Sequence, residues 1–350
     1  MRAAKLYDIG KLKVETVEIP EIGPSEVLIK TRVCGVCGTD VSMFRGRYLP
    51  VKPIIPGHEF SGEVVEIGEG VKNVKAGDRV TADENVSCGV CYYCKRQQKL
   101  MCTSLYQIGI HSDGGFAEYF KAPEGNVIRI PDELSYERAA FTEPLACATR
   151  AVDRAQIVPG DFVVVIGDGP IGLSVAQVAR LSGASQVVVC GHHEYRMSKA
   201  LEIGADGVID SRKKDPVSAV FELTERRGAD VVLEAVGKVS TYSQALEIVR
   251  RGGHVAVMGV PSAKESIDLK LFDQIFNKEM TLHASFAGTY DTWIRAVSLI
   301  SSGKFKVDPL ITHRAGLEEL PRAIELMEKR AENVIKIMTS PEYQGITELR

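Results

Sequence analysis

"VVVIGDGPIG", residues 163–172, is the stretch that decides the fold. An apolar run ends at Gly167, and Gly167, Gly169 and Gly172 have the spacing G-x-G-x-x-G. Gly167 permits a tight turn after a buried strand, Gly169 lets the backbone approach a pyrophosphate, and Gly172 allows close packing of a helix on the strand. The N–H groups that open this helix would face the phosphates. We therefore predict a dinucleotide site at Gly167, Gly169, Pro170, Ile171 and Gly172.

Beyond this loop, strands alternate with helical stretches. The runs DFVVVIG, QVVVC, ADVVLEAVG and HVAVMGV resemble strands, and the segments between them resemble helices. Strands without polar interruption are buried on both faces, which predicts a doubly wound parallel sheet. In this context a dinucleotide site explains the three glycines better than an unliganded turn does. We expect this α/β coenzyme domain to span residues 151–290.

The flanking segments have a different character. Residues 1–150 contain short β-branched runs such as EVLIKTRV and SGEVVEIG, separated by Gly, Pro and Asp turns, and they predict a β-rich domain. After residue 290, two helical stretches precede NVIKIMTS, which has the character of a closing strand. We expect residues 291–350 to return to the β-rich domain, so that the coenzyme domain is an insertion in it.

Composition excludes several classes of function. The chain has 350 residues, of which 45% are hydrophobic and 25% charged, as in soluble globular proteins. A net charge of -3 without a basic block gives no support for a nucleic-acid partner. No apolar run approaches the roughly 20 residues that span a bilayer, and no secretory signal opens the chain. We expect a cytoplasmic protein, in which clustered cysteines bind metal or act in catalysis.

Four cysteines lie close together in the first domain. Cys88, Cys91, Cys94 and Cys102 have the spacing C-x2-C-x2-C-x7-C, and four thiolates can surround one tetrahedral zinc with no open position. An iron–sulfur cluster uses similar ligands, but the run C-x2-C-x2-C-x3-C-P is absent. A redox pair would leave two cysteines unexplained. We predict a structural zinc in a lobe of about residues 84–105, with KRQQK inside it offsetting the thiolate charge.

The end of the second coenzyme strand bears on cofactor choice. An NAD site normally carries Asp or Glu there to hold the ribose 2′-OH. This chain has Gly191, followed by His192, His193 and Arg196. Losing the carboxylate removes a repulsion against a 2′-phosphate, and His192 or Arg196 could pair with that phosphate, so NADP is slightly favoured over NAD. The alternatives are that Glu194 reaches the ribose or that these residues face solvent.

The tetrapeptide CGVC occurs twice, at residues 88–91 inside the four-cysteine lobe and at residues 34–37, where no further cysteines lie nearby in the sequence. Cys37, His58 and an acidic residue make a mixed S, N and O set suited to a catalytic zinc with one open position. His58 taken alone is more often a packed or solvated histidine, so the spacing makes only part of the case.

The motifs CGVCGTD, GHEFSGEVVEIGEGVKNVKAGDRV, the four-cysteine lobe, GGFAEY, TEPLA and GDGPIG follow one another along essentially the whole chain. In this order they resemble the zinc-containing medium-chain dehydrogenases, in the branch of polyol (sorbitol) and threonine dehydrogenases. The resemblance implies a GroES-like catalytic domain, a Rossmann coenzyme domain and a homotetramer or homodimer. It also implies hydride transfer between NAD(P) and a small hydroxyl substrate, with zinc acting as a Lewis acid.

The resemblance also assigns site residues. Cys37 and His58 match the first two catalytic zinc ligands. Glu143 stands where alcohol dehydrogenases carry a third-ligand cysteine, and this branch also uses the Glu beside the histidine, here Glu59. Which of Glu59 and Glu143 binds zinc directly stays open. Asp40 matches a carboxylate that orients the histidine.

A proton relay is implied as well. Thr39 matches its first member, but Ser42 stands where the family often has histidine. The proton could leave through Ser42 and water, through the cofactor ribose, or through an acid such as Glu59. Ser42 could equally do no more than enlarge the pocket.

The substrate is the least constrained prediction. SMFRGRYLP lacks the HIYEW-like stretch of threonine dehydrogenases, and ITHRAG resembles the polyol branch. Arg45, Arg47 and Arg314 could bind an acidic sugar derivative or be ordinary surface charges. We favour a polyol, sugar alcohol or sugar acid, with threonine or a secondary alcohol as runners-up. A non-catalytic protein that reuses the fold is the alternative from another class, and retention of Cys37, His58 and Glu143 argues against it.

Overall fold

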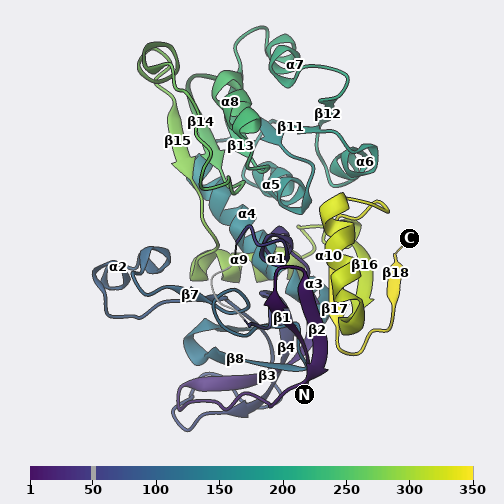
Figure 1. Cartoon of the computed structure of the whole chain (residues 1–350). Coiled ribbons are helices and arrows are strands. Elements are labelled where there is room, and N and C mark those ends of the chain that lie inside the picture. The colour runs from purple at the N-terminus through teal and green to yellow at the C-terminus, as the bar shows by residue number, and fades with distance from the viewer. Residues whose placement is uncertain (49–52, 350) are drawn as a thin grey trace. The chain divides into compact units, whose positions relative to one another are not determined.

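The computed structural model describes residues 1–48 and 53–349 (Figure 1). Contacts divide the chain into two compact units. The first consists of Met1–Glu143, Thr289–Gly303 and Ile311–Arg350, and the second of Pro144–Gly288 and Lys304–Leu310. The domain limits expected at 150/151 and 290/291 remain predictions. They do not anticipate that Lys304–Leu310 belongs with the second unit.

The second unit is built on a parallel sheet with six strands in the described part of the chain, in the order β12–β11–β10–β13–β14–β15. The central strands consist almost entirely of buried Val, Ile and Leu, because helices cover both faces of such a sheet. This confirms the predicted doubly wound Rossmann fold. The strands are β10 (Phe162–Ile166), β11 (Gln186–Gly191), β12 (Gly207–Asp210), β13 (Ala229–Glu234), β14 (Val249–Val257) and β15 (Thr281–Ala284).

Helices connect consecutive strands of this sheet. The first of them, α5, has Gly169 as its N-cap and Pro170 at its first helical position, where the missing proline N–H costs no hydrogen bond. A Cβ on Gly172 would lie 2.0 Å from the Gly167 carbonyl oxygen, so close packing at this point requires glycine. The helices are α5 (Pro170–Leu181), α6 (Glu194–Glu202), α7 (Pro216–Leu223), α8 (Val239–Ile248) and the π-helical η3 (Leu271–Phe276).

Two features of this sheet differ from the sequence interpretation. The helical pattern of residues 242–252 ends early, because α8 stops at Ile248 and β14 already begins at Val249. The edge strand β15 was not predicted. It is four residues long and mostly exposed, so it carries neither the buried run nor the alternation that reveals a strand.

The first unit is organised around β3, a ten-residue strand that pairs with β4, β8 and β17. Its sheet has the order β18–β16–β17–β3–β4–β5–β9, with β8 added beside β3. Two further strand pairs, β1 with β2 and β6 with β7, complete the unit. The bounds are β1 (Arg2–Asp8), β2 (Lys11–Thr16), β3 (Glu26–Gly35), β4 (Glu59–Ile67), β5 (Arg79–Ala82), β6 (Asn85–Val86), β7 (Tyr106–Gln107), β8 (Tyr119–Pro123), β9 (Val127–Arg129), β16 (Ile311–Gly316), β17 (Lys336–Ser340) and β18 (Ile346–Glu348).

The helices of the first unit come from both the N-terminal and the C-terminal parts of the chain. Among them, α10 packs on both α1 and β17. These helices are α1 (Gly38–Phe44), α2 (Tyr92–Lys95), α3 (Tyr136–Ala140), α9 (Tyr290–Ser301) and α10 (Leu320–Lys329), with the short 3-10 turns η1 (Lys99–Met101), η2 (Glu124–Asn126) and η5 (Leu317–Glu319). A further 3-10 turn, η4 (Asp308–Leu310), belongs to the second unit. The helix α4 (Thr142–Ala155) carries the junction between the two units.

Within residues 1–48 and 53–349, we find no helix with the length and apolar character needed to cross a membrane.

Candidate active site

Cys37, His58 and Glu59 come together in the first unit. The Cys37 sulfur, a ring nitrogen of His58 and a carboxylate oxygen of Glu59 all lie within 4.8 Å of one another. Cys37 follows β3 and precedes α1, whereas His58 directly precedes β4 and Glu59 is its first residue. The side chains of His58 and Glu59 are almost completely buried, at 3% and 1% exposure, and Cys37 is half-buried. This mixed S, N and O donor set fits zinc.

The β3–β4 pairing explains how the Glu59 carboxylate fits there. Gly35 pairs with Glu59 across the two strands, and a Cβ on Gly35 would lie 2.2 Å from Glu59 Oε2. The glycine of this CGVC copy therefore makes room for the carboxylate. Cys37 is also the N-cap of α1, and its backbone N–H donates to Asp40 Oδ2 at 2.8 Å.

Asp40 and His58 face each other inside this site. The distance from His58 Nδ1 to Asp40 Oδ1 is 3.6 Å, longer than a hydrogen bond, and neither atom has a hydrogen-bond partner within the described residues. Burial would lower the pKa of His58, but the Asp40 carboxylate and the Cys37 thiol raise it well above its usual value. Burial raises the pKa of Asp40 to about 6. His58 Nδ1 and Asp40 Oδ1 are thus buried without hydrogen-bond partners among the described residues, close to the Cys37 sulfur and the Glu59 carboxylate, as is typical of a metal site.

Sequence reasoning missed Lys336, which lies on β17 and is 2% exposed. Its Nζ is 2.7 Å from both carboxylate oxygens of Glu59 and donates to the Val36 carbonyl at 3.1 Å. Burial would lower the pKa of Lys336, but Glu59 raises it, so the ammonium stays charged. The one signal in the sequence is a lysine flanked on both sides by apolar residues, in VIKIM of NVIKIMTS.

The other predicted catalytic residues lie around this group. Glu143, in the first turn of α4, is buried and outside the 4.8 Å set found among the described residues, yet its charge raises the pKa of both His58 and Lys336. The Cys37 thiol is 3.8 Å from Thr39 Oγ1. Glu84 was not predicted: it is buried, its Oε1 accepts from Asn85 Nδ2 at 2.5 Å, and burial and then Glu143 raise its pKa.

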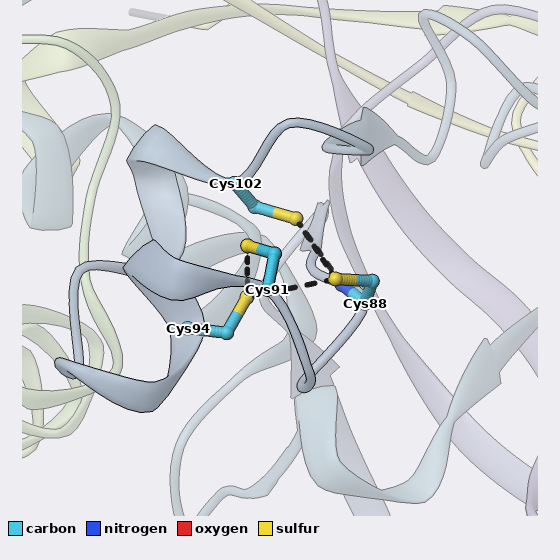
Figure 2. A group of neighbouring side chains, drawn as sticks. All are labelled: Cys88, Cys91, Cys94 and Cys102. Carbon is cyan, nitrogen blue, oxygen red and sulfur yellow. Dashed lines mark hydrogen bonds between the residues drawn. The ribbon is translucent and has the colours of Figure 1, made fainter.

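The four cysteines of the lobe converge on one point (Figure 2). Their sulfur atoms all lie within 4.8 Å of one another, with Cys91 and Cys102 each 3.5 Å from a neighbouring sulfur. Backbone N–H groups of Cys94 and Thr103 lower the pKa of Cys91 to about 6, which favours the thiolate that zinc requires. Lys99, expected to offset the thiolate charge, instead forms an ion pair with the buried Asp83.

The predicted cofactor residues gather at the carboxyl ends of β10 and β11. Gly167 follows β10, and Gly169 to Gly172 form the start of α5. Gly191 ends β11, His192 follows it, and Arg196 is buried on α6. The loop therefore has the geometry in which helix N–H groups face a pyrophosphate.

Three arginines considered as anion ligands are paired with carboxylates. Arg45 and Arg47 both bind Glu328, at 2.8 and 2.9 Å, and Arg314 binds both oxygens of Glu137. A substrate anion would have to compete with these partners.

Comparisons with known proteins agree with this geometry. Residues 23–132 match the alcohol dehydrogenase GroES-like domain, and residues 170–302 match the zinc-binding dehydrogenase family. The chain is 38% identical to the L-threonine 3-dehydrogenase of Bacillus licheniformis over 322 residues, covering 90% of this chain and 92% of that protein. It is 36% identical to the sorbitol dehydrogenase of Halalkalibacterium halodurans over 337 residues, covering 96% and 97%.

Comparison with solved structures identifies zinc-binding dehydrogenases as well. A zinc-binding dehydrogenase from Sinorhizobium meliloti, solved with NADP, matches with a TM-score of 0.93 at 36% identity, covering 97% of this chain and 99% of the other. The matches span both units, and the donor sets for two zinc ions lie in the first. The chain therefore belongs to the zinc-containing medium-chain alcohol dehydrogenase family and is an NAD(P)-linked oxidoreductase that acts on CH–OH groups.

Proposed function

We propose that this enzyme transfers a hydride between NAD(P) and a secondary hydroxyl of a polyol, sugar alcohol or sugar acid. A catalytic zinc would be held by Cys37 and His58 together with Glu59 or Glu143. The observation that carries this proposal is the convergence of a thiol, an imidazole and a carboxylate within 4.8 Å, because a protein that only binds ligands needs no such donor set.

Zinc at these residues would supply a Lewis acid that lowers the pKa of the substrate hydroxyl. The remaining tasks belong to the chain itself. Thr39 Oγ1, beside Cys37, accepts the hydroxyl proton and passes it on. Lys336 holds the Glu59 carboxylate by both oxygens and fixes its position. The loop from Gly167 to Gly172 binds the pyrophosphate and so orients the nicotinamide.

The four-cysteine lobe would hold a second zinc with no open position, which stabilises the lobe and takes no part in hydride transfer.

Threonine is the runner-up substrate, because threonine and sorbitol dehydrogenases resemble this chain about equally. Arg45, Arg47 and Arg314 bear on the choice, since their pairing with Glu328 and Glu137 leaves no free guanidinium among these three for the carboxylate of threonine, nor for that of a sugar acid. A neutral polyol needs none.

A substrate panel tests the proposal. Polyols, sugar acids, L-threonine and secondary alcohols are each assayed with NAD and with NADP. Formation of the reduced cofactor is followed by its near-ultraviolet absorbance. We expect the highest kcat/KM for a polyol, sugar alcohol or sugar acid. A higher kcat/KM for L-threonine would transfer the assignment to the runner-up, and no turnover of any hydroxyl substrate by the zinc-loaded protein would favour a non-catalytic role.

The proposal includes a homodimer or homotetramer. Large apolar side chains are exposed in the chain segment between β14 and the edge strand β15, including Val260 at 84%, Leu271 at 71% and Phe276 at 75%. Apolar surface of this kind commonly marks an interface, and an unpaired strand edge invites pairing with a second copy. A monomeric mass in light scattering at micromolar concentration would contradict this part of the proposal.

A further inference from the structure

Gly191 stands at the end of β11, where dinucleotide-binding sheets carry the acidic residue that holds the adenosine ribose. Its lack of a carboxylate was the reason to favour NADP from the sequence. The surroundings of Gly191 change that interpretation.

A carboxylate from another element occupies this place. Asp168 lies in the glycine loop after β10, and a Cβ on Gly191 would be 2.7 Å from both Asp168 Cβ and Asp168 Oδ2. These distances are shorter than any real Cβ contact, so a side chain at position 191 and the Asp168 side chain exclude each other. Glycine at position 191 therefore makes room for the aspartate side chain at position 168.

Asp168 also holds the turn that follows β11. Its Oδ2 accepts the backbone N–H groups of His192 and His193, both at 2.8 Å, and lies 3.0 Å from His193 Nδ1. Its Oδ1 is 3.2 Å from the same ring nitrogen, and a carboxylate oxygen has capacity for a further hydrogen bond. Asp168 is 3% exposed. Burial would raise the pKa of Asp168, but the two N–H groups and His193 lower it, so the group is ionised at neutral pH.

The nearby cations interact mainly with other groups, although Asp168, after Asp210 and Glu194, also raises the pKa of Arg212. Burial lowers the pKa of His193, so its ring is largely neutral near pH 7. Arg212 binds both oxygens of Asp210, which pairs with Gly191 across β11 and β12. Glu194 at the start of α6 adds another negative charge, and Arg196 on the same helix is buried.

Asp168, His192 and His193 also lie close enough together to suggest a metal site. A metal at Asp168 Oδ2 would have to displace two backbone N–H donors that already bind that oxygen. The hydrogen bonds therefore favour a role in shaping the turn.

We propose that Asp168 replaces the missing acidic residue of β11: it positions the Gly191–His193 turn, accepts a ribose hydroxyl and makes the enzyme prefer NAD to NADP. This inference rests on the proposed NAD(P)-linked function. The ionised carboxylate accepts a hydrogen bond from a 2′-OH and repels a 2′-phosphate.

Binding measured without turnover tests the inference. Dissociation constants of NADH and NADPH are obtained by fluorescence titration of the zinc-loaded protein without substrate. We expect NADH to bind at least about tenfold more tightly than NADPH, and Asp168→Asn to reduce that ratio at least about fivefold. The matched control is Asp206→Asn, because Asp206 also accepts a backbone N–H of β11, from Val187 at 2.7 Å, at the opposite end of the strand. It should leave the ratio unchanged.

Exchanging the two positions provides a second test. Gly191→Asp alone should weaken binding of both cofactors, because the new side chain collides with Asp168. Asp168→Gly combined with Gly191→Asp removes the Asp168 Cβ as well as its carboxylate, and should restore binding and the preference for NADH. A wild-type preference for NADPH, or an unchanged ratio in Asp168→Asn, would overturn the inference while leaving the dehydrogenase function intact. No binding of either cofactor would overturn both.

Discussion

Lys336 and Glu59 form an almost completely buried ion pair in the first unit. The two side chains are 2% and 1% exposed, and the ammonium contacts both carboxylate oxygens at 2.7 Å. Removing one partner of such a pair leaves an uncompensated buried charge, which typically costs about 3–5 kcal/mol. We expect Lys336→Met to lower the free energy of unfolding by about this amount, measured as a lower denaturation midpoint in calorimetry.

Two variants isolate the charge effect. Lys336→Met combined with Glu59→Gln removes both charges and should recover at least about half of the loss. Lys329→Met removes a lysine whose pairing with Glu325 is exposed to solvent, so its effect should stay below about 0.5 kcal/mol. If Lys336→Met were as mild as Lys329→Met, the buried pair would have no structural importance.

At the residue scale, roles that depend on the chemistry of a single side chain were predictable, whereas the ion-pair and hydrogen-bond partners of a side chain were not. Cys37 and His58 stand out because thiols and imidazoles are zinc ligands. Lys336 gave little signal, because lysine is usually exposed and its partner lies 277 residues away. Asp168 was hidden in the same way, since a glycine loop predicts a phosphate site and gives no hint that its middle residue reaches the end of β11.

At the scale of elements, Asp230 joins three strands of the coenzyme sheet. It lies on β13, its Oδ2 accepts the Phe162 N–H of β10 at 2.8 Å, and its Oδ1 accepts from Arg250 of β14 at 2.5 Å. A hydrogen bond to a charged group is worth about 1.5–3 kcal/mol. We expect Asp230→Asn to destabilise the protein by about 2 kcal/mol near pH 7, measured by chemical denaturation.

The same variant should reveal a pH dependence. Burial would raise the pKa of Asp230, but the bonds from Arg250 and the Phe162 N–H lower it below the usual value of 3.8. A depressed acid pKa contributes stability that is present above the unfolded pKa and is lost as pH falls through the folded pKa. The difference between wild type and Asp230→Asn should therefore be constant above about pH 5 and shrink as the pH falls below about 4. The exposed Asp291, changed to Asn, serves as the control, and a difference that grows on acidification would contradict this assignment.

Elements with a strong periodic or apolar pattern were predictable, and elements defined by their neighbours were not. The strand β10 and helix α5 follow from VVVIGDGPIG because an unbroken apolar run and a glycine turn specify them locally. The strand β15 exists because its backbone pairs with β14, while its side chains remain mostly exposed. The junction of α8 and β14 at Val249 was missed because LEIV continues the helical pattern into the strand.

At the scale of the whole molecule, the chain builds its first unit from three separate segments. The sequence predicts that the last segment returns, because its helices and closing strand follow the coenzyme fold. It gives no sign that Lys304–Leu310 belongs to the second unit. There Gln177 of α5 exchanges two hydrogen bonds with the backbone of Lys306, at 2.8 and 3.1 Å, and such a pairing has no local pattern.

The central claim is that the two CGVC copies serve two different zinc sites, and the zinc content per chain tests it most directly. Elemental analysis should give two zinc ions for wild type. Cys37→Ala should keep about one zinc, fold normally and lose at least about a hundredfold in kcat/KM.

The matched control is Cys34→Ala, which removes the other thiol of the same tetrapeptide, a buried residue outside the donor set found among the described residues. It should retain two zinc ions and its activity. Two zinc ions and full activity in Cys37→Ala would contradict the account.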